Sequence, residues 1–416
     1  MSAAPAGRAG RRPRLALLLG LLATVGAFSI DAFFPSLRAI AHDLDVSYLA
    51  AQQAVTAYMV PYAIMSLVHG SLSDALGRRR VVLAGLGVYA LASLGCALAP
   101  GFGALLACRA LQGVVAGAGH IVGRAIIRDR FSGVQAQRLM SAITVIFGLG
   151  PALAPVIGGW VHVWFGWRAV FATMALYGLG LLAFAYLRLP ETHPHELRAP
   201  LHVGHLARRL GAIAIDPRFL GLAYSSSLCF IAMQMYIGAA PAIILDHWHL
   251  GETQFAALTL PIIGGYVIAG YASGRMAGRV SPERQVRLGY RVLMALTAAM
   301  FLLQWQVADP PIFLQQLLLV GTSVGVQLVF PIVTLRIFDL FPEARGATSS
   351  LQSFSSLLLG TLIMGLAAPA LSGSLLMLAA MALLGAVAAW GLWQWAGRTA
   401  RPAAATAGAH PGHGGT

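Results

Sequence analysis

The sequence has few charged residues and no lysine, so all 28 of its basic residues are arginine. Charged residues fill only 10% of the 416 positions, whereas hydrophobic residues fill 58%. A soluble domain of this length could not cover its surface with so few polar groups. The scarcity of charge therefore excludes a soluble protein and predicts a polytopic membrane protein.

Cysteines and catalytic motifs are scarce as well. Cys96, Cys108 and Cys229 all fall in apolar segments, so we expect small buried residues and no disulfide framework. The absence of an H-E-x-x-H motif, of G-x-S-x-G in a suitable context and of paired aspartates within an apolar segment argues against an enzyme. His193, His195, His202 and His205 lack cysteines or carboxylates at a firm ligand spacing, so no metal site is expected.

Twelve apolar segments follow one another along the chain, each near the roughly 20 residues that cross a bilayer. We expect spans at about 15–37, 50–72, 81–99, 103–125, 138–163, 168–188, 218–241, 254–274, 287–307, 311–335, 346–368 and 374–396. The first predicted span follows several arginines, as the apolar core of a signal peptide does. It is, however, too long for a signal peptide, lacks an A-x-A cleavage site and precedes eleven more spans. We therefore predict that it is a transmembrane helix.

The arginines lie almost entirely on one side of these spans. On that side are Arg8, Arg11, Arg12, Arg14, Arg78 to Arg80, the groups Arg124 to Arg138, Arg188 to Arg218 and Arg275 to Arg291, then Arg336, Arg345, Arg398 and Arg401. Arg38 and Arg168 lie opposite, and Arg109 lies within a span. This positive-inside pattern predicts a multi-pass protein of the cytoplasmic (inner) membrane with both termini in the cytoplasm. Topology and contact with anionic lipid account for the formal charge of +14, so no nucleic-acid partner is expected.

The polar segment that begins at Pro190 divides the chain into two halves. We expect a cytoplasmic tail at 1–14, a six-helix bundle at 15–189, a cytoplasmic linker at 190–217, a second six-helix bundle at 218–397 and a disordered tail at 398–416. Offset by 200 residues, Gly70, Ser73 and Arg79 coincide with Gly270, Ser273 and Arg279, which indicates an internal repeat. Repeated halves place a substrate site between them, near the middle of the bilayer.

The most distinctive motif is GSLSDALGRRR, between the second and third spans. Its glycines permit close helix approach and a short turn, Asp74 can cap a helix or pair with an arginine, and the arginines stay in the headgroup layer. Such a loop can hold two helices in one state and release them in another. We predict a conformational latch of Gly70, Asp74, Gly77, Arg78 and Arg79. The spacing resembles the signature loop of the major facilitator superfamily, G-x3-D-x2-G-R-[R/K].

The fourth span carries Arg109, although its apolar part is otherwise free of charge. A buried guanidinium stays charged and requires a partner. Gly113, Gly117 and Gly119 thin this helix for a neighbour or a ligand. The run GAGHIVG does not have the G-x-G-x-x-G spacing of a nucleotide-binding loop and follows no strand, so that interpretation is rejected.

The fifth span contains FGLGPALAPVIGGW, whose prolines and glycines predict a kinked, closely packed helix. Its motif residues are Gly150, Pro151, Pro155, Gly158 and Gly159. In the family, a Gly-Pro motif here marks proton-driven exporters and is thought to seal the path against leak. Ala154 and Pro155 stand where paired glycines usually fall, a variant similar to the bicyclomycin/chloramphenicol-resistance-type branch of the twelve-helix drug:proton antiporters.

The first span ends in SIDAFFPSL, with Asp31 four residues before Pro35, which is also typical of that branch, as is FPEARGATSSL before the eleventh span. Asp31 is the one acid placed deep in a span. Burial favours its neutral form and a nearby Arg109 its charged form, and this balance can change as the halves rock. We therefore predict that Asp31 and Arg109 couple proton movement to transport. A hydrated Asp31 at the mouth of the first span is the alternative.

Residues with aromatic, thioether or amide side chains are candidates for a substrate cavity that suits adaptable hydrophobic ligands. They are Tyr58, Met59, Tyr62, Gln234, Tyr236, Tyr266 and Gln327. His69 and His120 could relay protons, although the residues favour a packing role within the helices for each.

The resemblance implies an all-α membrane protein with twelve transmembrane helices in two six-helix pseudo-symmetric bundles, the major facilitator fold. It implies proton-coupled efflux of hydrophobic small molecules or antibiotics by alternating access, in a monomer that uses the proton gradient and no cofactor. A proton-coupled carrier of a specific metabolite is the alternative. A second charged residue in the cavity would favour it.

Overall fold

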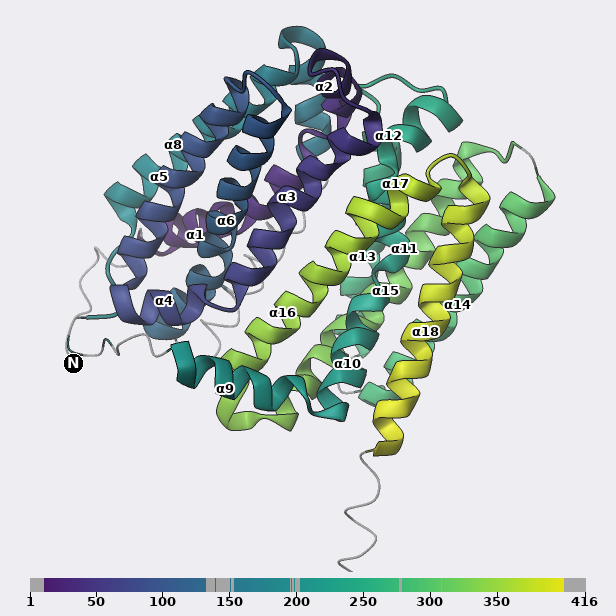
Figure 1. Cartoon of the computed structure of the whole chain (residues 1–416). Coiled ribbons are helices and arrows are strands. Elements are labelled where there is room, and N and C mark those ends of the chain that lie inside the picture. The colour runs from purple at the N-terminus through teal and green to yellow at the C-terminus, as the bar shows by residue number, and fades with distance from the viewer. Residues whose placement is uncertain are drawn as a thin grey trace, which may run out of the picture.

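A computed structural model of the chain is helical throughout its described part (Figure 1). The structure describes residues 11–131, 153–194, 203–276, 279–307 and 309–399, together with Leu139, Gly150, Glu196 and Arg198. Within these residues every regular element is a helix. The prediction of an all-α protein is therefore confirmed.

The helices of the first half lie side by side on the left of Figure 1. They are α1 (Arg11–Asp31), the turn η2 (Phe34–Ser36), α2 (Leu37–Asp43), α3 (Tyr48–Ser66), α4 (His69–Leu76), α5 (Arg78–Ala97), α6 (Phe102–Arg130), the helix Leu153–Phe165 and α8 (Trp167–Arg188). Helix α6 packs against α1, α3 and α5. Its glycines allow this, since a Cβ on Gly113 would lie 2.1 Å from the Tyr58 carbonyl oxygen and one on Gly119 would lie 2.4 Å from that of Leu22. The backbones of α1 and α3 therefore approach α6 directly.

The second half lies on the right of Figure 1. Its elements are α10 (Pro217–Leu228), α11 (Ile231–Gly238), α12 (Ala240–Ala242), the π-helical turn η4 (Ile243–His247), α13 (Ala256–Met276), α14 (Pro282–Gln306), α15 (Ile312–Leu340), η5 (Pro342–Ala344), α16 (Arg345–Leu362), the π-helical turn η6 (Ile363–Ala367), α17 (Ala368–Leu371) and α18 (Leu375–Thr399). Helix α15 packs against α10, α13 and α14, as α6 packs against α1, α3 and α5 in the first half. Glycines again permit the approach, because a Cβ on Gly265 of α13 would lie 2.3 Å from the Val320 carbonyl oxygen.

The described residues contain nine helices long and apolar enough to span a membrane, and two bent pairs raise the number to eleven. The pairs are α3 with α4, bent by 57°, and α10 with α11, bent by 43°. In α10 the hydroxyls of Ser226 and Ser227 both donate to the Ala223 carbonyl, which competes with the backbone ladder next to the bend. The fifth predicted span is represented by the apolar helix Leu153–Phe165, and the first part of that span, apart from Leu139 and Gly150, lies outside the described residues. Membrane-spanning helices are therefore confirmed.

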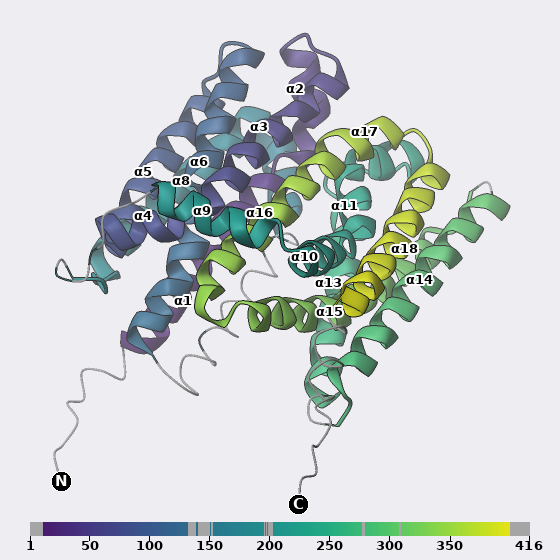
Figure 2. The same cartoon turned by 60° about the horizontal axis from the view of Figure 1, so that its bottom comes forward.

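Helix α9 (Val203–Ala214) occupies the second part of the predicted linker and runs across one end of the molecule between the two halves (Figure 2). It contacts α16 and α10, and its residue Ile213 is buried among apolar side chains of the second half. We call this end, where α4 and α9 lie, the arginine-rich end. The opposite end, where α2, α12 and α17 lie, is the arginine-poor end (Figure 1).

Candidate functional site

Arg109 of α6 is fully buried in the first half, with 0% of its surface exposed. Its Nε donates to the Ala54 carbonyl at 3.0 Å, and its Nη1 donates to the Ser29 carbonyl at 3.0 Å and to Gln112 Oε1 at 2.9 Å. The guanidinium also lies 4.4 Å from the ring centroid of Phe33 and 4.5 Å from that of Tyr58. Carbonyl oxygens and aromatic faces thus stabilise the positive charge of Arg109. The sequence had instead led us to expect an acidic partner.

Gln112 supports this arrangement and could not be identified from its sequence position. Its Nε2 donates to Ser93 Oγ at 2.7 Å, while its Oε1 accepts from Arg109. The amide therefore joins α5 to α6 beside the guanidinium. The Nη2 of Arg109 has no hydrogen-bond partner among the described residues. One guanidinium donor therefore remains available to another acceptor.

Asp31 is the last residue of α1 and is buried, with 5% of its surface exposed. Its carboxyl group makes no ion pair within the described part of the chain, with Arg109 or any other base. Helical periodicity places Asp31 one turn after Ala27 and two turns after Thr24, the residues that Gly150 approaches. Asp31 therefore lies on the α1 face toward the fifth predicted span. In this conformation the structure does not bring Asp31 and Arg109 together. The burial of Asp31 also differs from the alternative prediction of a hydrated Asp31 at the mouth of the first span.

The predicted glycine motif of the fifth span packs against both halves. A Cβ on Gly158 would lie 1.7 Å from the Ala32 carbonyl oxygen, and one on Gly159 would lie 2.4 Å from that of Glu252 in the second half. Close packing at these two glycines is therefore required. Pro155 lies in the helix Leu153–Phe165, whereas Pro151 lies outside the described residues.

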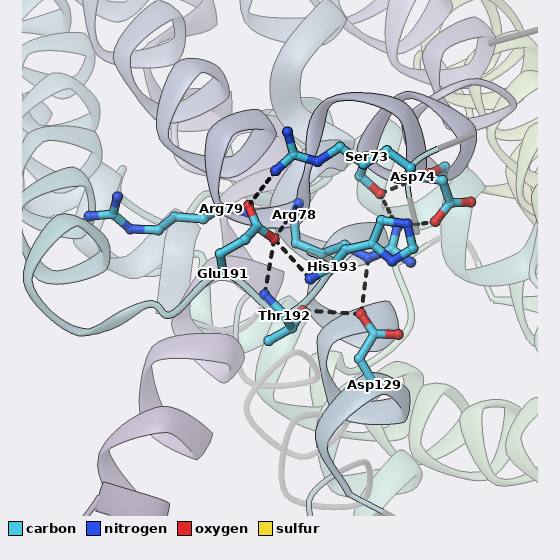
Figure 3. A network of polar contacts seen from close by, with 10 residues as sticks. Ser73, Asp74, Arg78, Arg79, Asp129, Glu191, Thr192 and His193 are labelled. Atoms are coloured by element: carbon cyan, nitrogen blue, oxygen red, sulfur yellow. Dashed lines mark hydrogen bonds and ion pairs between the residues drawn. The ribbon is translucent and has the colours of Figure 1, made fainter. Parts of the chain in front are cut away.

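The predicted latch forms a polar network at the arginine-rich end (Figure 3). Arg78 is 6% exposed, and its guanidinium lies 2.5 Å from Asp74 and 3.1 Å from Asp129 at the end of α6. Arg79 donates to the Tyr186 carbonyl at 2.8 Å. The structure thus brings Asp74, Gly77, Arg78 and Arg79 together, in contact with the ends of α6 and α8.

Glu191, just after α8, completes the network (Figure 3). Its Oε1 accepts from the backbone N–H of Arg78 at 3.0 Å, and its Oε2 accepts from that of Arg79 at 3.3 Å. The carboxylate therefore caps the start of α5, where amides lack helical partners and the helix dipole favours an anion. Sequence reasoning placed Glu191 in the linker. Its P-E-T context after a span was the available signal, but the sequence alone did not indicate which helix it would cap.

Gly77 and Gly70 serve the latch differently. Gly77 has φ +97°, and a Cβ there would lie 2.6 Å from Glu191 Oε2 and 2.7 Å from Arg198 Nη2. Gly70 has no other atom within 4 Å of such a Cβ. Only the first position requires glycine in this conformation.

Across the arginine-poor end the two halves touch. Arg38 forms an ion pair with Asp246, and His162 Nε2 lies 3.3 Å from Glu252 Oε2. Further along the interface, Gln53 of α3 donates to the Gly365 carbonyl at 3.2 Å. A hollow of about 460 Å³ lies beside the Arg38–Asp246 pair. These contacts hold the halves together at this end.

At the arginine-rich end a cavity of about 590 Å³ separates the halves. Its walls come from α4, α5, α6, α9, α15 and α16, and they include Asp74, Arg78, Arg124, Arg209 and Arg345. The molecule therefore stands open toward its arginine-rich end and closed at the other.

The predicted cavity residues lie deeper than this opening, and none of the seven lines it. Tyr58 covers Arg109 and donates to the Gly26 carbonyl at 3.1 Å, which ties it to the first half. A Cβ on Gly360 of α16 would lie 2.9 Å from Gln234 and 3.4 Å from Met59, so these two meet α16 between the halves. Tyr266 packs on Phe230, and Tyr236 is buried with its hydroxyl unbonded among the described residues. Tyr62 contacts Gly117, and Gln327 is half-buried in α15.

Histidines show no metal centre in the described part of the chain. His195 and His202 lie outside the described residues. His69 is buried beside Gly117, since a Cβ on that glycine would lie 3.2 Å from the His69 Nδ1, and His120 lines the cavity. His120, eleven residues after Arg109, therefore lies on the same face of α6 as Arg109, whereas His69 contacts α6 from α4.

Comparisons agree with this architecture. Residues 16–364 match the model of the Major Facilitator Superfamily. The chain is 31% identical over 355 residues to the uncharacterized MFS-type transporter YdgK of Bacillus subtilis, covering 85% of this chain and 88% of that protein. It is 30% identical over 298 residues to a bicyclomycin resistance protein homolog of Haemophilus influenzae, covering 70% and 75%. It is 26% identical over 317 residues to multidrug resistance protein MdtM of Escherichia coli, covering 75% of each.

Among solved structures, a D-xylose-proton symporter superposes with a TM-score of 0.72 at 15% identity, covering 91% of this chain and 96% of that one. A bacterial homolog of the human lysosomal transporter Spinster superposes with a TM-score of 0.69 at 16% identity, covering 94% and 98%. At these identities the likeness shows a shared fold.

Proposed function

The chain belongs to the Major Facilitator Superfamily, and we propose that it exports hydrophobic small molecules or antibiotics from the cell in exchange for protons. The relatives named for bicyclomycin and multidrug resistance support export as the direction. The arginine-rich end then faces the cytoplasm of a cell-membrane protein with both termini inside, in keeping with the positive-inside pattern. The transporter works as a monomer driven by the proton gradient.

The observation that carries proton coupling is the burial of Asp31 without an ionic partner among the described residues. A charged, unpaired carboxylate in such a place costs several kcal/mol, so the group is protonated in this conformation. Opening at the arginine-poor end must separate contacts close to Asp31, such as that between Gly159 and Glu252. Water that enters there stabilises the carboxylate and exchanges its proton.

Arg109 assists by keeping a fixed positive charge on the other side of α1. Its contacts with the Ser29 carbonyl and the Phe33 ring bracket Asp31 in sequence. A small rotation of the end of α1 would bring the carboxylate toward the guanidinium, whose Nη2 has no acceptor among the described residues. The predicted pair between Asp31 and Arg109 belongs to such a rearranged state, in which the proton has left.

The latch and the fifth span govern the movement between the halves. In this conformation Arg78, Asp74, Asp129 and Glu191 bind one another within the first half. That half therefore moves as a unit at its cytoplasmic end. Gly158 and Gly159 let the fifth span contact α1 and the second half, so the path to Asp31 stays sealed on the outer side.

A carrier for a specific metabolite is the second candidate. Arginines beyond Arg109 line the cytoplasmic cavity, and a carrier for an acidic metabolite needs such groups.

The drug exporter and the metabolite carrier both predict that a proton gradient drives substrate transport. Transport by purified protein in liposomes tests the export function. With the lumen acidified, radiolabelled chloramphenicol should accumulate in the lumen through molecules whose arginine-rich end faces outward. Accumulation should stop when nigericin collapses the gradient. Accumulation that survives nigericin would contradict proton coupling, and accumulation of an acidic metabolite in place of chloramphenicol would favour the metabolite carrier.

A further inference from the structure

The cavity at the arginine-rich end carries an excess of positive charge. Of the described residues that line it, four are arginines and one is a carboxylate, Asp74. Asp74 is itself bound to Arg78 at 2.5 Å. The other three arginines come from three different helices, with Arg124 on α6, Arg209 on α9 and Arg345 on α16, and Arg345 also lies 3.9 Å from Asp339 of α15. A mouth with one sign of charge concentrates molecules of the opposite sign and repels those of the same sign.

Basic side chains continue from the mouth into the first half along α6. Arg109, Gly113, His120 and Arg124 fall within one sector of that helix, since 11 and 15 residues are close to whole numbers of turns at 3.6 residues each. His69 joins them from α4, beside Gly117. The positive-inside pattern explains arginines in the headgroup layer, but it does not explain basic groups within the spans.

Carboxylates are missing from the membrane-spanning parts of the same walls, and the acids of α6 and α15, Asp129 and Asp339, lie at the ends of those helices. Residues 48–68 of the second span, 102–127 of the fourth, 312–338 of the tenth and 346–362 of the eleventh contain neither aspartate nor glutamate. A cation that entered from the arginine-rich end would pass Asp74 and then meet no acidic side chain on these walls. An anion that entered the cavity would meet Arg124 and then His120, both of which line it.

From this arrangement we propose that the substrates are lipophilic organic anions, such as aromatic carboxylates, and that Arg124, Arg209 and Arg345 select them at the cytoplasmic mouth. The inference rests on the proposed export function and narrows it. Guanidinium groups bind carboxylates through paired N–H donors, and the apolar walls accommodate the rest of the molecule. Lipophilic cations are excluded at the mouth, before they reach Asp31.

Two xanthene dyes of similar size and opposite charge test the proposal, fluorescein as the anion and rhodamine 123 as the cation. Their initial uptake rates are measured in the proton-driven liposomes, beside neutral chloramphenicol. We expect fluorescein to be taken up and rhodamine 123 not. Replacing Arg124, Arg209 and Arg345 together with glutamine should lower fluorescein uptake about tenfold at low dye concentration, within the range that a focused field produces. The loss should shrink as salt shortens the Debye length from about 30 Å at 0.01 M to about 10 Å at 0.1 M.

Two further variants separate charge from folding. The triple replacement by lysine at the same three positions keeps the charge and should retain most fluorescein uptake. Glutamine at Arg284, Arg287 and Arg291, exposed arginines at the same end on α14 that do not line the cavity, should leave uptake unchanged. Preferential uptake of rhodamine 123, or a cavity variant that behaves as the α14 variant does, would overturn the anion proposal while export stands. Failure of all three probes to move with the gradient would instead overturn export itself, and the anion proposal with it.

Discussion

The carboxylate of Glu191 lies 3.0 Å from the backbone nitrogen of Arg78, the first residue of α5. The same carboxylate accepts from the backbone of Thr192 and His193, each at 3.0 Å, so one side chain fixes both its own turn and the start of α5. It thereby joins the end of α8 to the latch. Within the described residues these partners all belong to the first half or to the turn that follows it, so the cap stabilises the first half.

Replacing Glu191 with alanine should lower the free energy of unfolding by about 0.5–2 kcal/mol, the range measured for lost helix caps. Replacement with glutamine keeps an acceptor and should cost less, because only the charge at the helix terminus is lost. Thermal unfolding of detergent-purified protein measures both. Glu196→Gln is the control, since Glu196 is exposed in the same segment. An alanine variant as stable as the wild type would show that Glu191 does not stabilise the start of α5.

The two latch glycines give a matched pair of substitutions. Gly77→Ala should destabilise by at least about 1–2 kcal/mol, because a side chain at φ +97° is strained and the new Cβ meets the Glu191 and Arg198 side chains. Gly70→Ala adds a Cβ with no neighbour within 4 Å and should be neutral or slightly stabilising. Unfolding midpoints of the two variants provide the comparison. Equal effects at the two positions would show that the turn at Gly77 differs from the one described.

Much of the latch follows from the sequence, because it is local. Gly77 lies between the end of α4 and the start of α5, and Asp74 and Arg78 are four residues apart, so spacing alone predicts the turn and allows the pair as one of two roles for Asp74. Asp129 and Glu191 join the latch from 51 and 113 residues away from Arg78. Such contacts depend on how helices pack, which a single sequence does not encode in its spacing.

The same limit explains Arg109. Its burial follows from an arginine within an apolar span, but its partners are backbone carbonyls of Ala54 and Ser29. Every residue has a carbonyl, so no residue type marks these partners in the sequence. The sequence argument therefore favoured Asp31, the one acid at hand. The bends of α3 with α4 and of α10 with α11 were missed for a similar reason, since a bent apolar segment has the composition of a straight one.

Replacing Arg109 with glutamine should lower the free energy of unfolding by several kcal/mol, because the Ala54 and Ser29 carbonyls would be left buried without a charged donor. Lysine should restore only part of the loss, since one ammonium cannot reach both carbonyls in the geometry of a planar fork. Chemical unfolding in detergent measures each change. Arg168→Gln is the control, because Arg168 is partly exposed near the arginine-poor end. A fully stable Arg109→Lys variant would contradict the role given to the fork.

The ion pair between Arg38 and Asp246 links the halves at the arginine-poor end, and breaking it should favour opening there. Both side chains are partly exposed, so the shift is about 1 kcal/mol or less, at most about fivefold in the population of the open state. The native cysteines are free, two of them buried, so each would be replaced by alanine before a single reporter cysteine is placed at Ser36. Arg38→Asp should raise the rate of maleimide labelling at that buried position, and adding Asp246→Arg should lower it again. A charge swap that fails to reverse the effect would exclude the pair as a contact between the halves.

Proton release on substrate binding tests most directly the claim that Asp31 carries the coupled proton. Detergent-purified protein in weakly buffered solution is mixed with chloramphenicol, which carries no charge, and a pH-sensitive dye that chloramphenicol does not perturb records the protons released. Asp45→Asn is the control, because Asp45 is exposed and asparagine tolerates its φ of 50°. We expect release from the wild type and from Asp45→Asn, and none from Asp31→Asn although it still binds the substrate. Equal release from the wild type and Asp31→Asn would contradict the account.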